Sequence, residues 1–178
     1  YGLELSEDKT KAVFIATTFT GKMPLVNEVK ILDIKTKTVD LLAKDYSFAY
    51  ANFIDSENII TVATDMKEYG INENSNIYII NIKEKSFEKI VNDNFDMCMN
   101  NSVGTDCIDV SKDGKIYAVA LKDSNLQDIY EISMEEENRI SFHNDTTEYS
   151  LSEIEEINFT NDGIGFIGYV MKPVDYDP

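Results

Sequence analysis

The sequence predicts an all-β protein, because apolar and polar residues alternate along short segments that are separated by polar turns. No segment shows the apolar stripe with a period of 3.6 residues that marks a surface helix. Hydrophobic residues make up 43% of the 178 residues and aromatic residues 11%, which is typical of a folded chain rather than a disordered one. The length suits one domain with a substantial core.

One type of predicted hairpin recurs along the chain. Its copies are residues 3–16, 51–63, 108–120 and, more loosely, 157–170. Each copy has a short alternating strand, a turn rich in Ser, Asp, Asn or Gly, and a second apolar strand. The spacing between successive copies is 48, 57 and 49 residues when they are matched at Leu5, Phe53, Val110 and Phe159.

A second type of hairpin lies between these copies. It covers residues 28–42, 76–90 and, more loosely, 128–142, with polar turns at Lys35–Lys37, Lys83–Lys85 and Glu135–Glu137. Two hairpins per repeat of roughly 50 residues give four strands per repeat, and such units pack face to face around an axis as propeller blades. A β-sandwich also has many short strands at regular spacing, but it does not require two hairpin types to alternate in strict order.

The number of repeats predicts a partial β-propeller. Residues 1–164 hold about three to three and a half four-stranded antiparallel blades, whereas closed propellers have about four to eight. The chain is therefore either a small, unusual propeller or a segment of a larger one.

The last residues read DGIGFIGYVMKPVDYDP and run from Asp162 to Pro178. Asp-Gly is a hairpin turn, and Pro173 ends the alternating strand that follows it. Together with the four-stranded repeats, this ending resembles the junction in the prolyl oligopeptidase family of serine peptidases, and the acylaminoacyl-peptidase-like branch most of all. In that family an α/β-hydrolase domain follows the propeller. The resemblance implies that residues 165–178 are a linker strand leading to a hydrolase domain that is absent here.

The same resemblance implies a role for the chain. The parent would hydrolyse short peptides through a Ser-His-Asp triad, and this chain would be the C-terminal half of the propeller that covers the active site and excludes folded proteins. The chain has no G-x-S-x-G motif, and its one histidine, His143, lies in a polar segment. We therefore expect no catalytic residue in this chain and no activity from it alone. A strand at 165–172 without its own sheet predicts dimerisation or disorder at the C-terminus. An incomplete propeller is also expected to self-associate through its open blade edges.

The formal net charge is −17. Such a chain repels nucleic-acid phosphates and anionic membranes, so we expect neither as a partner. The acidity gives solubility, and it also attracts cations such as peptide amino termini. Some relatives contact such termini with paired acids of the propeller, which makes Glu153, Glu155 and Glu156 candidate substrate contacts. The acids Glu135–Glu137 occupy a predicted turn, where we expect them to be solvated.

We expect no metal or other cofactor. Asp109, Ser111, Asp113 and Gly114 match the first positions of a calcium loop, but Ala120 occupies the place of the final acidic ligand. A hairpin turn explains the same residues. The two cysteines, Cys98 and Cys107, do not make a disulfide framework or a zinc site, which predicts a cytoplasmic protein with reduced thiols, although one bridge between them stays open. The richness in Ile, Lys, Asn and Asp suggests a bacterial, AT-rich genome.

Two other functions remain open at this point. The chain could be a stand-alone propeller-like module that binds a peptide or protein and has no enzymatic activity. It could also be a complete small β-domain with an unknown ligand, which would be monomeric and would unfold in one transition.

Overall fold

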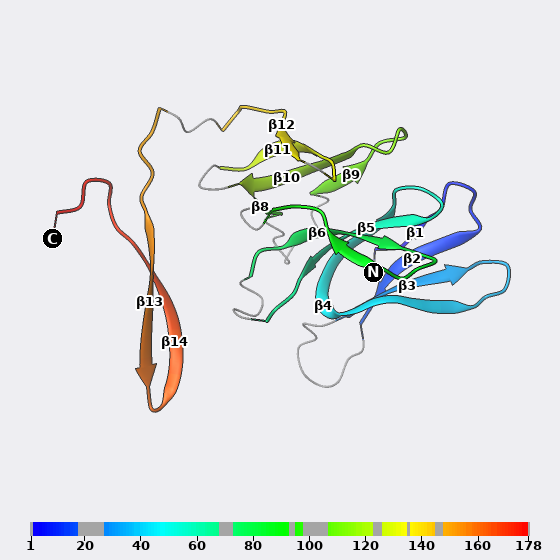
Figure 1. Cartoon of the computed structure of the whole chain (residues 1–178), viewed down its shortest axis with the longest axis horizontal. Helices are drawn as coiled ribbons and strands as arrows, with labels where there is room; N and C mark the ends of the chain where they lie inside the picture. Colours follow the sequence, from blue (N-terminus) through cyan, green and yellow to red (C-terminus); the bar gives the residue numbers. More distant parts are fainter. Residues whose placement is uncertain are drawn as a thin grey trace.

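A computed structural model of the chain describes residues 2–17, 27–67, 73–92, 95–97, 107–122, 126–134, 136–144 and 148–177 (Figure 1). All regular elements in these ranges are β-strands, fourteen in number. Within these ranges no helix is long and apolar enough to cross a membrane. The predicted all-β class is confirmed.

Two blades share one seven-stranded antiparallel sheet. Blade 1 consists of β1 (Glu4–Leu5), β2 (Lys11–Ala16), β3 (Asn27–Asp33) and the first part of β4 (Val39–Phe53). Blade 2 consists of the second part of β4, then β5 (Asn58–Thr64), β6 (Asn76–Asn81) and β7 (Phe87–Lys89). Strand β4 serves both blades because Asp45, at φ 69°, redirects the chain without ending the strand.

Blade 3 is a separate sheet whose first strand is divided in two. Strands β8 (Phe95–Asp96) and β9 (Ile108–Val110) pair with different ends of β10 (Ile116–Lys122). Strands β11 (Asp128–Ile132) and β12 (Glu137–Arg139) complete the blade. The spacing of 57 residues, instead of 48, falls on the repeat that contains this division.

The first two copies of the second type of hairpin lie 48 residues apart, and their turns have the same backbone conformation and hydrogen bonds. Lys37 and Lys85 both have positive φ, 60° and 55°, and their amides both donate to the residue four positions earlier. The side chains of Asp33 and Asn81 each accept turn amides. The alignment of residues 28–42 with residues 76–90 is therefore confirmed.

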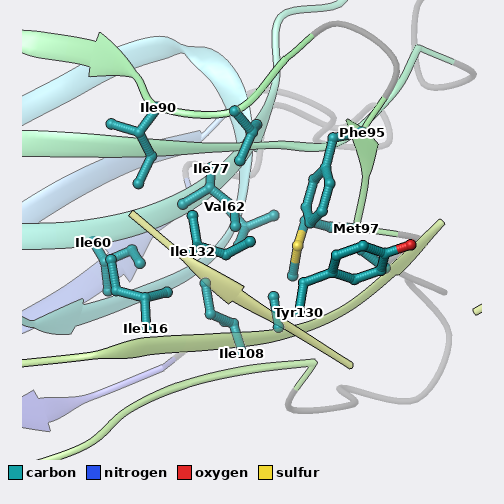
Figure 2. Packing of buried hydrophobic residues seen from close by; sticks show 13 residues of the cluster. Ile60, Val62, Ile77, Ile90, Phe95, Met97, Ile108, Ile116, Tyr130 and Ile132 are labelled. Atoms are coloured by element: carbon teal, nitrogen blue, oxygen red, sulfur yellow. The ribbon is translucent and has the colours of Figure 1, made fainter. Parts of the chain in front are cut away.

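The blades stack through their apolar faces. We call the face of a blade that packs against the next blade in the chain its forward face, and the opposite face its backward face. One core cluster joins the forward face of blade 1 to the backward face of blade 2; it includes Val13, Ile15, Val29, Ile31, Ile59, Tyr78 and Ile80. A second cluster joins blades 2 and 3 in the same manner (Figure 2); it includes Ile60, Val62, Ile77, Ile116, Ala118, Tyr130 and Ile132.

Strands β13 (Ile154–Asn161) and β14 (Ile164–Met171) form a hairpin that stands apart from the blades (Figure 1). The predicted turn is confirmed, with Asp162 and Gly163 at φ 49° and 77°. The strand expected to be left without a sheet is paired with β13 over its whole length. The predicted domain boundary after residue 164 falls inside this hairpin, which forms one unit. The expectation that the end of the hairpin leads to a hydrolase domain stays a prediction.

Candidate functional site

A pocket of about 520 Å³ lies where the first hairpins of the three blades converge. Each blade contributes the end of its first strand and the turn that follows. The matched positions are Leu5, Phe53 and Val110, then Ser6, Ile54 and Ser111, then Glu7, Asp55 and Lys112. We call this the axial pocket, because the first turns of all three blades meet there.

Two of the three turns that line the axial pocket have the same internal bonding. In blade 1 the Ser6 hydroxyl accepts the amide of Lys11 at 2.9 Å, and in blade 3 the Ser111 hydroxyl accepts the amide of Lys115 at 3.0 Å. Each serine also lies within hydrogen-bonding distance of the aspartate two residues later. These bonds occupy the serine hydroxyls, so the turns form a fixed rim.

The axial pocket carries charges of both signs. Bonds from the Thr10 amide and from the Ser6 and Thr10 hydroxyls lower the pKa of Asp8. Burial raises the pKa of Asp55, but bonds from Asn58 and the Glu57 amide outweigh it and lower the pKa overall. Both carboxylates are therefore ionised at neutral pH. Lys11 and Lys112 supply positive charge to the same lining, which suits a ligand with ends of opposite charge, such as a peptide.

The structure corrects the expectation for Glu135–Glu137. Glu135 lies outside the described residues, and Glu136 is exposed in the turn as expected. Glu137 instead begins β12 and is buried, where it accepts hydrogen bonds from Asn92 and pairs with Lys122 at 3.0 Å. Because the turn is shorter than predicted, the third acid of the run enters the strand and points into the protein.

The predicted substrate contacts lie elsewhere. Glu153, Glu155 and Glu156 are exposed at the start of the β13–β14 hairpin and do not line the axial pocket. Glu155 pairs with Lys172 on the neighbouring strand, and Glu156 accepts a bond from Asn158 at 3.1 Å. Their contact with a peptide terminus stays a prediction.

Other sequence candidates have ordinary surroundings. His143 is exposed, and its backbone faces the buried Asp128. The calcium-like segment forms the predicted hairpin turn around Gly114, at φ 81°. Cys107 is half-buried, whereas Cys98 lies outside the described residues, so a bridge between the two cysteines stays untested. In the described ranges no group of three or more His, Cys, Asp or Glu side chains is placed to hold a metal ion.

Solved structures of peptidases resemble this fold. The uncomplexed acylaminoacyl peptidase of Pyrococcus horikoshii is 12% identical, with a TM-score of 0.68, and the match covers 97% of this chain and 25% of that chain. A puromycin-hydrolyzing peptidase of Mycobacterium tuberculosis is 11% identical, with a TM-score of 0.63 over 78% of this chain and 21% of its own. The chain thus spans about a quarter or less of the length of these peptidases.

The likeness extends beyond peptidases. TolB of Acinetobacter baumannii is 13% identical, with a TM-score of 0.56 over 96% of this chain and 40% of its own. No protein-family model matches the sequence, and no curated protein matches it either. At these identities the comparisons establish the fold: the chain is a partial β-propeller, and it resembles the propeller regions of acylaminoacyl and prolyl oligopeptidase-type peptidases. The resemblance stated from the sequence is confirmed at that level.

The axial pocket was not among the sites predicted from the sequence. The signal was present, since Leu5, Phe53 and Val110 are the positions at which the repeats align. Residues directly after these positions begin the turns that form the rim. The three turns come together only because the blades stack, and no local sequence pattern predicts that arrangement.

Proposed function

We propose that this chain is a non-catalytic propeller segment of a prolyl-oligopeptidase-type serine peptidase and that it controls which substrates reach the catalytic domain. The axial pocket carries the proposal, since equivalent turns of three blades surround it. Its volume of about 520 Å³ suits a short peptide segment and is far too small for a folded domain. The similarity to the Pyrococcus horikoshii acylaminoacyl peptidase over 97% of this chain supports the same assignment.

The first test is to sequence the source gene past the codon for Pro178. We expect about 250 further codons that encode G-x-S-x-G and then an Asp and a His, as the hydrolase order requires. A stop codon at that point would contradict the proposal.

The gating role is tested with the full-length protein. We expect hydrolysis of a short fluorogenic peptide and no hydrolysis of the same peptide sequence placed inside a folded protein domain. The variant with Ala at the nucleophile of G-x-S-x-G is the control for contaminating peptidases. Equal cleavage of the free peptide and of the folded substrate would show that the propeller does not select substrates.

A non-enzymatic peptide-binding module is the second candidate, and the mixed charge of the axial pocket favours it. In that case residues 1–178 alone should bind a short zwitterionic peptide in calorimetry, and Lys112→Ala should weaken the binding. Lys89→Ala, outside the axial pocket, is the matched control.

A further inference from the structure

Each of the three turns around the axial pocket contains one aspartate whose carboxylate is bonded to the turn itself. Asp8 accepts hydrogen bonds within the turn of blade 1, Asp55 within that of blade 2 and Asp113 within that of blade 3. Such bonds fix the shape of a turn and use the lone pairs of the carboxylate. These three acids therefore add charge near the pocket but have little remaining capacity to bind a ligand.

The residue next to each of these aspartates lines the axial pocket and has no such role. It is Glu7 in blade 1, Ser56 in blade 2 and Lys112 in blade 3. All three are exposed, and within the part of the chain that the structure describes none of these side chains has a hydrogen bond or an ion pair. Each blade thus offers the pocket one polar group without a partner: a carboxylate, a hydroxyl and an ammonium.

The charge of the lining changes sign from blade 1 to blade 3. Blade 1 contributes two carboxylates, Glu7 and Asp8, against one ammonium, Lys11, which lies close enough to Asp8 to help lower its pKa. Blade 2 contributes Asp55, and blade 3 contributes Lys112. Because the two core clusters place blade 2 between the other two blades, the lining is negative at one side of the pocket and positive at the other.

We propose that the axial pocket binds a short peptide with free ends in one direction, with the amino terminus at blade 1 and the carboxyl terminus at blade 3. Glu7 pairs with the terminal ammonium, Lys112 pairs with the terminal carboxylate, and Ser56 bonds to the peptide backbone between them. One apolar side chain from each blade also lines the pocket and contacts the side chains of the peptide: Leu5, Phe53 and Val110. The inference rests on the proposed function, because it takes the axial pocket as the place where peptides meet the propeller.

The test is calorimetric binding of tetra-alanine to the full-length protein, with Ala at the nucleophile of G-x-S-x-G so that the peptide stays intact. If the gene encodes no hydrolase domain, the native protein is used. The peptide is supplied with free ends, with an acetylated amino terminus or with an amidated carboxyl terminus. We expect each blocked peptide to bind about fivefold more weakly than the free one, since each loses one charge pair. Glu7→Gln should remove the penalty for acetylation and keep the penalty for amidation, and Lys112→Gln should do the reverse.

Glu57→Gln and Lys9→Gln are the matched controls, because they remove the same charges at exposed turn positions that do not line the pocket. Neither should change the two penalties, and circular dichroism checks that every variant keeps its β-structure. No binding of the free peptide, equal binding of free and blocked peptides, or penalties that survive both pocket substitutions would each overturn the inference. The proposed function fails separately: it requires hydrolysis of short peptides by the native full-length protein, which is measured without these variants.

Discussion

Glu137 on the edge strand of blade 3 holds Asn92 at the end of blade 2. The Glu137 carboxylate accepts the Asn92 backbone amide at 2.7 Å and the Asn92 side-chain amide at 2.9 and 3.0 Å. Lys122 pairs with the same carboxylate. One buried acid thus fixes the position of one blade against the next, across 45 residues of chain.

Removal of this acid should destabilise the protein. We expect Glu137→Ala to lower the free energy of unfolding by about 2–4 kcal/mol, because a buried amide and an ammonium lose their acceptor. Urea denaturation measures the change. Glu136→Ala, one residue earlier and exposed, should shift the free energy of unfolding by less than about 0.5 kcal/mol. Equal effects of the two substitutions would contradict the role of Glu137.

Stability should fall at acidic pH because of two buried acids. Burial raises the pKa of Glu137, but bonds from Asn92 and Lys122 outweigh it and hold the pKa below 4.5. Burial likewise opposes the bonds from Ser141 and Arg139 that lower the pKa of Asp128 below 3.8. An acid whose pKa is lower in the folded state stabilises the fold fully above its unfolded pKa, and this contribution is lost as pH falls through the folded pKa.

The melting temperature should therefore be constant above about pH 5.5 and fall steadily below about pH 4.5. Differential scanning calorimetry of the native chain and of Glu137→Gln between pH 7 and pH 3 provides the comparison. We expect a shallower acid limb for the variant. Parallel curves would mean that protonation of Glu137 does not contribute.

We expect the side chain of Asn27 to stabilise the protein at the bulge in β4. Its side chain takes the place of a strand partner: it donates to the Phe48 carbonyl at 3.0 Å and accepts the Phe48 amide at 2.7 Å, in a buried position. Asn27→Leu leaves both backbone groups of Phe48 without these bonds, and we expect a loss of about 2–3 kcal/mol in unfolding free energy. Asn138→Ala, on the exposed surface, should cost less than about 0.5 kcal/mol. A neutral Asn27→Leu would show that the bulge does not need this side chain.

The β13–β14 hairpin should be less protected than the blades. Its residues are exposed over most of both faces, and a two-stranded sheet is marginally stable in water on its own. Hydrogen exchange should be much faster for amides of β14 than for amides of β5, whose residues are almost all buried. Similar protection of β14 and β5 would show that another surface covers the hairpin in solution.

Gly114 and Lys9 occupy the same position in two equivalent turns. We expect removal of glycine from one turn and its introduction in the other to have opposite effects on stability. Gly114 has φ 81°, and Lys9, at the matching position in blade 1, has φ 58°. Gly114→Ala should destabilise the protein by about 1 kcal/mol, since a side chain in this region of φ is strained. Lys9→Gly should be neutral or slightly stabilising, because the relief of strain opposes the added freedom of the unfolded chain. Thermal unfolding of both variants measures this, and a stabilising Gly114→Ala would refute the equivalence of the turns.

The sequence by itself determined the local structure. Asp162-Gly163 had to form a tight hairpin, and the pattern around Lys37 and Lys85 had to give matching turns, because turn residues and strand alternation act over a few residues. The number of strands per repeat followed from these local signals. Likewise, the alternation of two hairpin types was enough to favour blades over a sandwich.

Only the tertiary structure decided which face of each strand is buried and against what. The first turn of blade 1 is one residue longer than its counterparts. The repeat spacing of 48 residues would match Val13 with Thr61, but in the structure Val13 occupies the position of Ile60, on the forward face of its blade. Side chains alternate between the two faces of a sheet, and a shift of one residue reverses them all. The burial of Glu137 and the axial pocket depend on this stacking, because each is made by residues from different blades.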